Sequence, residues 1–137
     1  MASYEHRINV HVSASAVWDA IRDVGNLHLR VAPGLVTSVQ MDADGSARVV
    51  TFGNGMVLRE PIISINDAAF RLAWTAQSDQ WSHHNASLQV FDCGDGQSET
   101  VWIADVLPHD AGPTISMIME MGLAAMKAHL EQGIGAA

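Results

Sequence analysis

The sequence is poor in cysteine. Cys93 is the only cysteine in 137 residues, so the chain forms no internal disulfide and offers no thiolate cluster to zinc or to an iron–sulfur centre. A single thiol suits a reducing compartment. The adjacent His83 and His84 cannot chelate one metal from one face of a strand, and no pair of histidines has the HxH or HExxH spacing. We therefore expect no metal and no other cofactor.

Basic residues are scarce as well. The chain has 7 Lys and Arg residues against 15 Asp and Glu residues, which gives a formal net charge of −8, and the basic residues are scattered along the sequence. Nucleic acid and anionic membrane surfaces repel such a chain. We expect neither of them as a partner.

Long apolar runs are also missing. No run approaches the roughly 18 residues that a membrane helix needs, and the first ten residues, MASYEHRINV, carry polar side chains where a signal peptide needs an apolar core. We expect a cytoplasmic protein without a membrane-inserted segment. The apolar residues are spread instead through the chain, at 48% hydrophobic against 16% charged, which is enough for the core of one domain over residues 1–137.

The first part of the chain predicts one strand and two short helices. Residues 4–12 alternate between two faces, as in a half-buried strand. Residues 14–24 form an amphipathic helix that either Ser13 or Ser15 caps, and residues 26–34 add a second short helical turn.

Six strands and one long helix complete the prediction. The turn sequences DADG, GNG, ND, SDQ and CGDG separate the strands. The helix has Pro113 in its first turn and Gly133 just past its end. Consecutive antiparallel strands should curl around this helix, so we expect an α+β fold with a curved seven-stranded sheet and a hydrophobic cavity between sheet and helix. The six strands are expected at residues 35–41, 47–52, 56–65, 70–77, 82–91 and 99–106. The apolar stripe of the helix is Ile115, Ile118, Met119, Gly122, Leu123, Met126 and Leu130.

Four segments carry a resemblance to a known superfamily. They read VSASAVWDAIRDVGNL, GNGMVLREPIISINDAAFRLAWT, ASLQVFDCGDGQSETVWIADV and MGLAAMKAHLE. In this order of elements the chain resembles the Bet v 1-like, START-related (SRPBCC) helix-grip superfamily, in particular its small bacterial members of the polyketide cyclase/dehydrase and lipid-transport type. The resemblance implies a hydrophobic ligand held between the sheet and the last helix, but fold alone does not define an activity.

The resemblance also implies residue roles. Plant hormone receptors of the superfamily have a pocket glutamate at the position of Glu60 and an aromatic residue at that of Trp74. They also use a lysine after the first helices, where this sequence has Arg30 as its only charge. In relatives, the turn corresponding to GNG can act as a gate over the pocket.

Strand alternation identifies the side chains that face the expected cavity. Residues 82–91 have a polar face with His83 and an apolar face with His84, so His84 should point inward and His83 to water. Met117 and Met121 are placed toward the cavity because flexible thioethers suit a wall that accommodates apolar ligands. The expected ligand-binding residues are Arg48, Val50, Leu58, Glu60, Trp74, His84, Ala86, Trp102, Met117 and Met121.

Glu60 and His84 are the candidate catalytic residues if the protein is an enzyme. A carboxylate in an apolar cavity has a raised pKa unless a cation such as Arg48 restores its charge. A neutral Glu60 can act as acid or base, whereas a paired one can orient a ligand or merely satisfy Arg48. His84 can equally be a core histidine bonded to the backbone, and the tryptophans can be packing residues.

Three classes of function remain open. The mostly apolar inward face with few polar groups favours a carrier or sensor of a hydrophobic or amphipathic small molecule. The alternative is a polyketide cyclase/dehydratase-like enzyme that uses Glu60 and His84 as acid and base without a metal. A protein-interaction module is the third possibility, although the outward faces of the strands are polar.

Overall fold

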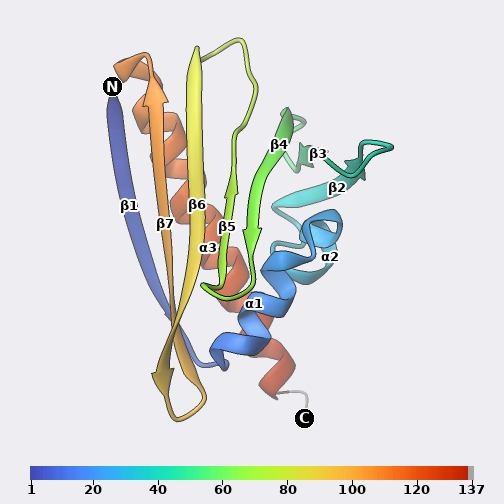
Figure 1. Cartoon of the computed structure of the whole chain (residues 1–137), viewed down its shortest axis with the longest axis vertical. Helices are drawn as coiled ribbons and strands as arrows, with labels where there is room; N and C mark the ends of the chain where they lie inside the picture. The colour runs from blue at the N-terminus through green and yellow to red at the C-terminus, as the bar shows by residue number, and fades with distance from the viewer. Residues whose placement is uncertain (136–137) are drawn as a thin grey trace.

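One curved antiparallel sheet wraps a long C-terminal helix (Figure 1). The computed structural model describes residues 1–135, and side chains up to residue 133; the end of the expected domain at residue 137 lies outside this range. The sheet order is β1-β7-β6-β5-β4-β3-β2, and the helix α3 (Gly112–Gly135) packs mainly on β1 and β7. The predicted α+β helix-grip fold is confirmed. The strands are β1 (Ala2–Val10), β2 (Val36–Met41), β3 (Ala47–Phe52), β4 (Val57–Asn66), β5 (Arg71–Trp74), β6 (His83–Gly94) and β7 (Gln97–Leu107).

Most strand boundaries lie one to three residues from the expected positions, and the ends of β5 and α3 show why. β5 ends at Trp74, and beyond it the pairing with β4 continues only through the hydrogen bond from Thr75 to the Pro61 carbonyl and the isolated bridge between Arg59 and Gln77. The helix α3 does not stop before Gly133, and its backbone runs on to Gly135. Gly133 is not among the residues with positive φ, so it lacks the left-handed conformation with which glycine usually ends a helix.

Two short helices connect β1 to β2. Helix α1 (Ala14–Arg22) starts at Ser13, whose hydroxyl accepts a hydrogen bond of 3.3 Å from the backbone N–H of Ala16, so Ser13 is the cap. A 3-10 turn, η1 (Val24–Asn26), leads into α2 (Leu27–Arg30). A second 3-10 turn, η2 (His109–Ala111), precedes α3.

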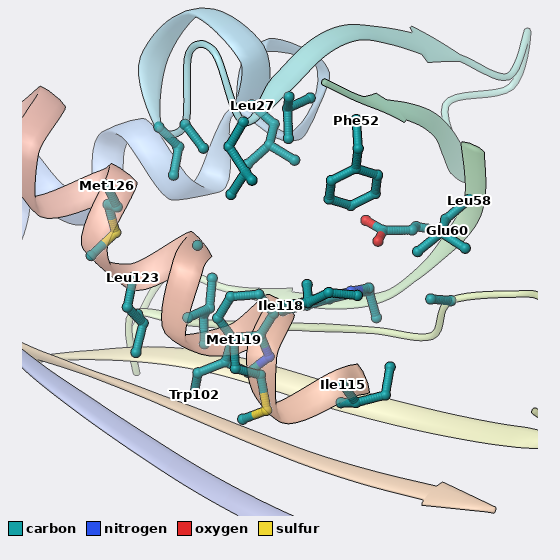
Figure 2. A pocket seen from close by; sticks show the side chains of 18 of the residues that line it. Leu27, Phe52, Leu58, Glu60, Trp102, Ile115, Ile118, Met119, Leu123 and Met126 are labelled. Atoms are coloured by element: carbon teal, nitrogen blue, oxygen red, sulfur yellow. The ribbon is translucent and has the colours of Figure 1, made fainter. Parts of the chain in front are cut away.

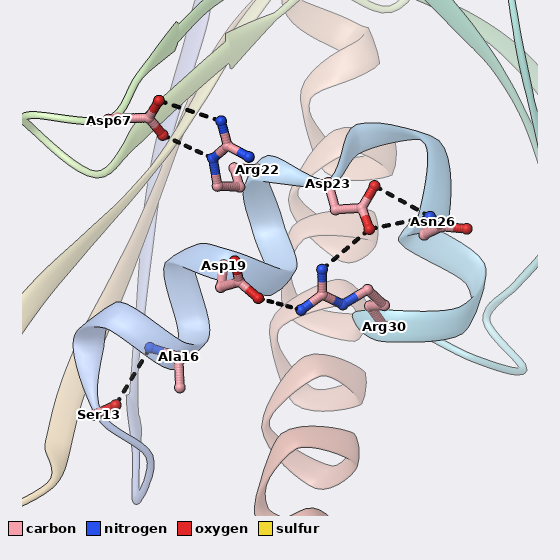
Figure 3. A network of polar contacts seen from close by, with 8 residues as sticks. All are labelled: Ser13, Ala16, Asp19, Arg22, Asp23, Asn26, Arg30 and Asp67. Carbon is pink, nitrogen blue, oxygen red and sulfur yellow. Dashed lines mark hydrogen bonds and ion pairs between the residues drawn. The ribbon is translucent and has the colours of Figure 1, made fainter.

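Exposed ion pairs hold α2 against α1 (Figure 3). Arg30 bonds to Asp19 of α1 at 2.6 Å and to Asp23, the residue that follows α1, at 3.1 Å. The Asn26 amide and, secondly, Arg30 hold the pKa of Asp23 below its ordinary value. Each pair adds little stability at the surface, and both join α2 to the residues that precede it.

No helix in residues 1–135 is both long enough and apolar enough to cross a membrane.

Candidate functional site

A cavity of about 70 Å³ lies between the inner face of the sheet and α3 (Figure 2). Helix α3 supplies one wall with Ile115, Ile118, Met119, Gly122, Leu123 and Met126. Helix α2 and the segment after it supply a second wall with Leu27, Val31, Ala32, Leu35 and Val36. The sheet supplies the third wall, and all the charged or titratable lining residues lie on it: Arg48, Glu60 and His84.

These three polar residues lie in one row across the sheet. Arg48 on β3 is opposite Glu60 on β4. The bridge between Arg59 and Gln77 places Ala76 beside Glu60, and Ala76 contacts the His84 side chain on β6. Because neighbouring strands are about 4.8 Å apart, the backbones of Glu60 and His84 lie roughly 10 Å from each other. One ligand of moderate size can therefore contact both.

Arg48 and Glu60 form a buried ion pair. Arg48 Nε donates to Glu60 Oε1 at 2.9 Å, and Arg48 Nη1 donates to the Val24 carbonyl at 3.2 Å. The guanidinium also lies 5.8 Å from the ring centroid of Trp74, within reach of a cation–π contact. Burial raises the pKa of Glu60, while the charge and hydrogen bond of Arg48 oppose that rise.

Only one oxygen of Glu60 is used by the protein. Oε2 accepts no hydrogen bond from the residues that the structure describes, and the carboxylate points into the cavity beside Phe52 (Figure 2). Oε2 is therefore a free acceptor for a ligand.

His84 is buried and neutral. Its Nδ1 accepts a hydrogen bond of 2.9 Å from the backbone N–H of Ala76, so the proton of the neutral ring is on Nε2. Trp81 packs against the imidazole with ring centroids 5.9 Å apart. Desolvation by burial, with a smaller contribution from His83, lowers the pKa of His84 to about 4. At neutral pH the ring therefore offers one donor, Nε2–H.

Most of the expected residues reach the cavity. The expected residues that line it are Arg48, Leu58, Glu60, Trp74, His84 and Trp102. His83 is exposed, as alternation predicts. Val50 and Ala86 point inward and are buried, but they lie in the packed core and not among the lining residues. Ligand contact by any of these residues stays a prediction.

The expected orientation of Met117 and Met121 is wrong. Their side chains are 57% and 49% exposed, and neither lines the cavity. On a helix with 3.6 residues per turn these two positions lie outside the buried stripe. The methionines that do line the cavity, Met119 and Met126, belong to that stripe.

Sequence reasoning missed the second wall. Leu27 and Val31 have the i, i+4 spacing of one helical face, which was a usable signal. Phe52 shares the inward face of β3 with Arg48 and Val50 and was a further candidate.

Within residues 1–135, no three His, Cys, Asp or Glu side chains are gathered so that they could hold a metal ion.

The curved sheet closed over a long helix, with an apolar cavity between them, defines a helix-grip protein. The chain belongs to the polyketide cyclase / dehydrase and lipid transport family, whose model matches residues 1–134. This confirms the superfamily resemblance. None of the curated proteins compared matches the chain.

Solved structures share the fold at low identity. Protein XoxI from Bacillus cereus has a TM-score of 0.85 and 18% identity, over 97% of this chain and 99% of that chain. One half of the di-domain ARO/CYC BexL from the BE-7585A biosynthetic pathway has a TM-score of 0.81 and 16% identity, over 96% of this chain and 47% of that chain. A START superfamily protein from Mycobacterium smegmatis has a TM-score of 0.76 and 14% identity, over 95% and 97% of the two chains. These likenesses show the fold alone.

Proposed function

We propose that the protein binds a hydrophobic or amphipathic small molecule in the cavity between the sheet and α3, as a carrier or sensor. One observation carries this proposal: the apolar lining has a short row of polar groups at one end, with Glu60 Oε2 and the His84 Nε2–H free of protein partners within the described residues. Apolar walls with a few convergent polar groups are the usual composition of small-molecule sites.

Binding requires the cavity to open. Its volume of about 70 Å³ is below the roughly 300–1,000 Å³ of drug-sized sites, and an engineered cavity of about 150 Å³ in another protein holds benzene. Leu27, Leu35 and Phe52 are partly exposed members of the lining. Their outward movement would enlarge the site.

The turn after β3 supports such a movement. Gly53 donates its N–H to the Leu35 carbonyl at 2.8 Å, and a Cβ on Gly53 would lie only 2.8 Å from the Gly34 carbonyl oxygen. This hydrogen bond thus joins the turn after β3 to the loop that follows α2. Gly55 has a φ of +89°, which glycine adopts at little cost.

Native mass spectrometry followed by thermal-shift titration tests the proposal. We expect either a co-purified small molecule or a stabilisation by uncharged apolar compounds that grows with their concentration. The exposed variant His83→Ala should respond like the wild type, whereas His84→Ala should respond less. If no species co-purifies and no compound stabilises the wild type, the proposal fails.

A second candidate is a cyclase/dehydratase-like enzyme, and a specific observation favours it. Burial raises the pKa of Glu60 against the opposing effect of Arg48 and lowers the pKa of His84, so a carboxyl group and a neutral imidazole with opposite shifts line one cavity. When the surroundings of two titratable groups move their pKa values in opposite directions, one group can serve as the acid and the other as the base. Turnover of a β-hydroxyketone to an enone, abolished in Glu60→Gln while ligand binding persists, would support the enzyme. Binding without turnover would support the carrier.

A further inference from the structure

We infer that the Arg48–Glu60 pair makes the cavity select uncharged ligands and reject carboxylates, and that loss of the Glu60 charge reverses this preference. The inference rests on the proposed function and specifies the chemical class of its ligand. Arg48 is the only permanent cation among the residues that line the cavity. The charge available to a ligand therefore depends on what Arg48 already contacts.

Arg48 is already committed to the protein. Nε donates to Glu60, Nη1 donates to the carbonyl of Val24, and the guanidinium lies near the ring of Trp74. Arg48 is 3% exposed and Glu60 is 6% exposed, so water screens neither charge well. A ligand carboxylate that reached the remaining nitrogen, Nη2, would bring its charge close to that of Glu60. This repulsion, together with the desolvation of the ligand charge, disfavours a carboxylate.

The free polar atoms favour a neutral ligand instead. Glu60 Oε2 is an acceptor without a partner in the described residues, so it suits a hydroxyl or amide N–H on the ligand. The neutral His84 offers one N–H, which suits a carbonyl or ether oxygen. A carboxylate supplies no donor for Glu60. A primary amide of the same shape supplies two.

2-Naphthamide and 2-naphthoate form the matched probe pair, because they differ only in the replacement of NH₂ by O⁻. At pH 7, calorimetry on the wild type should show the amide binding at least tenfold more tightly than the carboxylate. In Glu60→Gln the side chain keeps its size but loses its negative charge, so a ligand carboxylate can pair with Arg48 Nη2 without repulsion, and the order of affinities should reverse. Glu99→Gln is the control, because Glu99 pairs with Arg7 at 3.2 Å on the exposed outer surface.

A double variant tests the inference even if Glu60→Gln does not fold. Arg48→Met combined with Glu60→Met removes both charges, and replacement of a buried ion pair by apolar residues is often tolerated. This variant lacks the cation that a carboxylate would pair with, so 2-naphthoate should still bind more weakly than 2-naphthamide. A double variant that preferred 2-naphthoate would overturn the inference, because the charge of Arg48 would then not be what reverses the order.

The possible failures are distinguishable. If the wild type binds neither probe nor naphthalene, the proposed function fails and the inference fails with it. If the wild type binds amide and carboxylate equally well, the cavity is a ligand site but the inference is wrong. A folded Glu60→Gln variant that keeps the preference for the amide would overturn the inference as well.

Discussion

Arg48 and Glu60 face each other across β3 and β4 and join their side chains by one hydrogen bond of 2.9 Å in the interior of the protein. The pair is at the edge of a cavity, where its attraction must offset the desolvation of two charges. Its net contribution to stability is therefore small, but the two groups depend strongly on each other. Removal of one partner leaves the other charge buried and unpaired.

A single substitution in this pair should change the free energy of unfolding much more than the double substitution does. We expect Arg48→Met to lower the free energy of unfolding by about 3–5 kcal/mol, whereas Arg48→Met with Glu60→Met should fall within about 1 kcal/mol of the wild type or above it. Urea unfolding of the wild type, both single variants and the double variant measures the coupling. Additive losses would show that the pair does not act as a unit.

The pKa of His84 predicts how stability depends on pH. Unfolded, this histidine takes up a proton near pH 6.5, but folded it does so only near pH 4. Its contribution to stability is complete above pH 6.5, falls as the pH drops through this window and is lost by pH 4, because the unfolded chain binds the proton first. The loss amounts to about 3 kcal/mol.

Two adjacent histidines provide the comparison. His84→Asn should flatten the dependence of unfolding free energy on pH between 6.5 and 4, while the asparagine oxygen can still accept from Ala76. His83→Asn should leave the slope unchanged, since His83 is exposed. Equal slopes in all three proteins would mean that His84 is protonated as easily in the folded state as in the unfolded state.

The alternation of strand residues predicted the sheet side of the cavity well. His84, Glu60 and Trp74 lie inward because a strand has a side-chain period of two and the apolar face must be buried. The same reasoning could not show that Val50 and Ala86 are packed away from the cavity. That depends on how the sheet curves over the helices.

The helical walls were harder to predict for a different reason. Met117 and Met121 were placed by the softness of their side chains, although the apolar stripe through Met119 and Met126 already argued for another face. The wall from α2 had a local signal in the i, i+4 spacing of Leu27 and Val31. The position of this short helix beside the cavity, however, depends on its tertiary contacts, among them those with β2, and a local pattern does not specify these.

Three buried polar atoms on the inner face of β7 offer a stabilising change. Ser98 Oγ, Thr100 Oγ1 and Trp102 Nε1 are buried and have no hydrogen-bond partner in the described part of the chain. Thr100 is 0% exposed, so Thr100→Val removes an unsatisfied hydroxyl with little change of shape and should raise the free energy of unfolding by about 1–3 kcal/mol. Thermal and urea unfolding measure this gain.

The control for that change is a threonine that has a partner. The Thr37 hydroxyl is exposed and donates to the Thr51 carbonyl at 3.2 Å, so Thr37→Val should change stability by less than about 1 kcal/mol. A loss of stability in Thr100→Val would mean that its hydroxyl is satisfied, for example by a buried water.

Arg30 should control the motion of the α2 wall and have little effect on overall stability. One of its ion pairs is exposed and the other only partly buried, so Arg30→Ala should cost about 1 kcal/mol or less in global unfolding. Hydrogen exchange at the amides of Val31 and Ala32, which both donate to the Leu27 carbonyl, should become faster. Arg7→Ala, which breaks exposed pairs on β1, should leave those amides protected. Unchanged exchange in Arg30→Ala would show that the apolar contacts of α2 alone hold it.

At Gly122 the helix α3 approaches Trp102, which lines the cavity, closely. A Cβ at this position would lie 2.7 Å from Trp102 Cζ3, and Trp102 in turn packs on Trp74 with ring centroids 5.5 Å apart. Gly122→Ala must therefore displace the indole. We expect a loss of about 1–3 kcal/mol from overpacking, partly offset by about 1 kcal/mol of helix propensity, and weaker binding of an apolar probe.

Gly133 on the same helix separates these two effects. A Cβ there meets no atom within 4 Å, so Gly133→Ala gains helix propensity without a collision and should stabilise the protein by about 0.5–1 kcal/mol. Unfolding free energies and probe affinities of both variants measure the difference. If Gly122→Ala stabilised the protein as much as Gly133→Ala and bound the probe unchanged, Trp102 would have room to move aside, and the wall that it forms would not limit the size of the ligand.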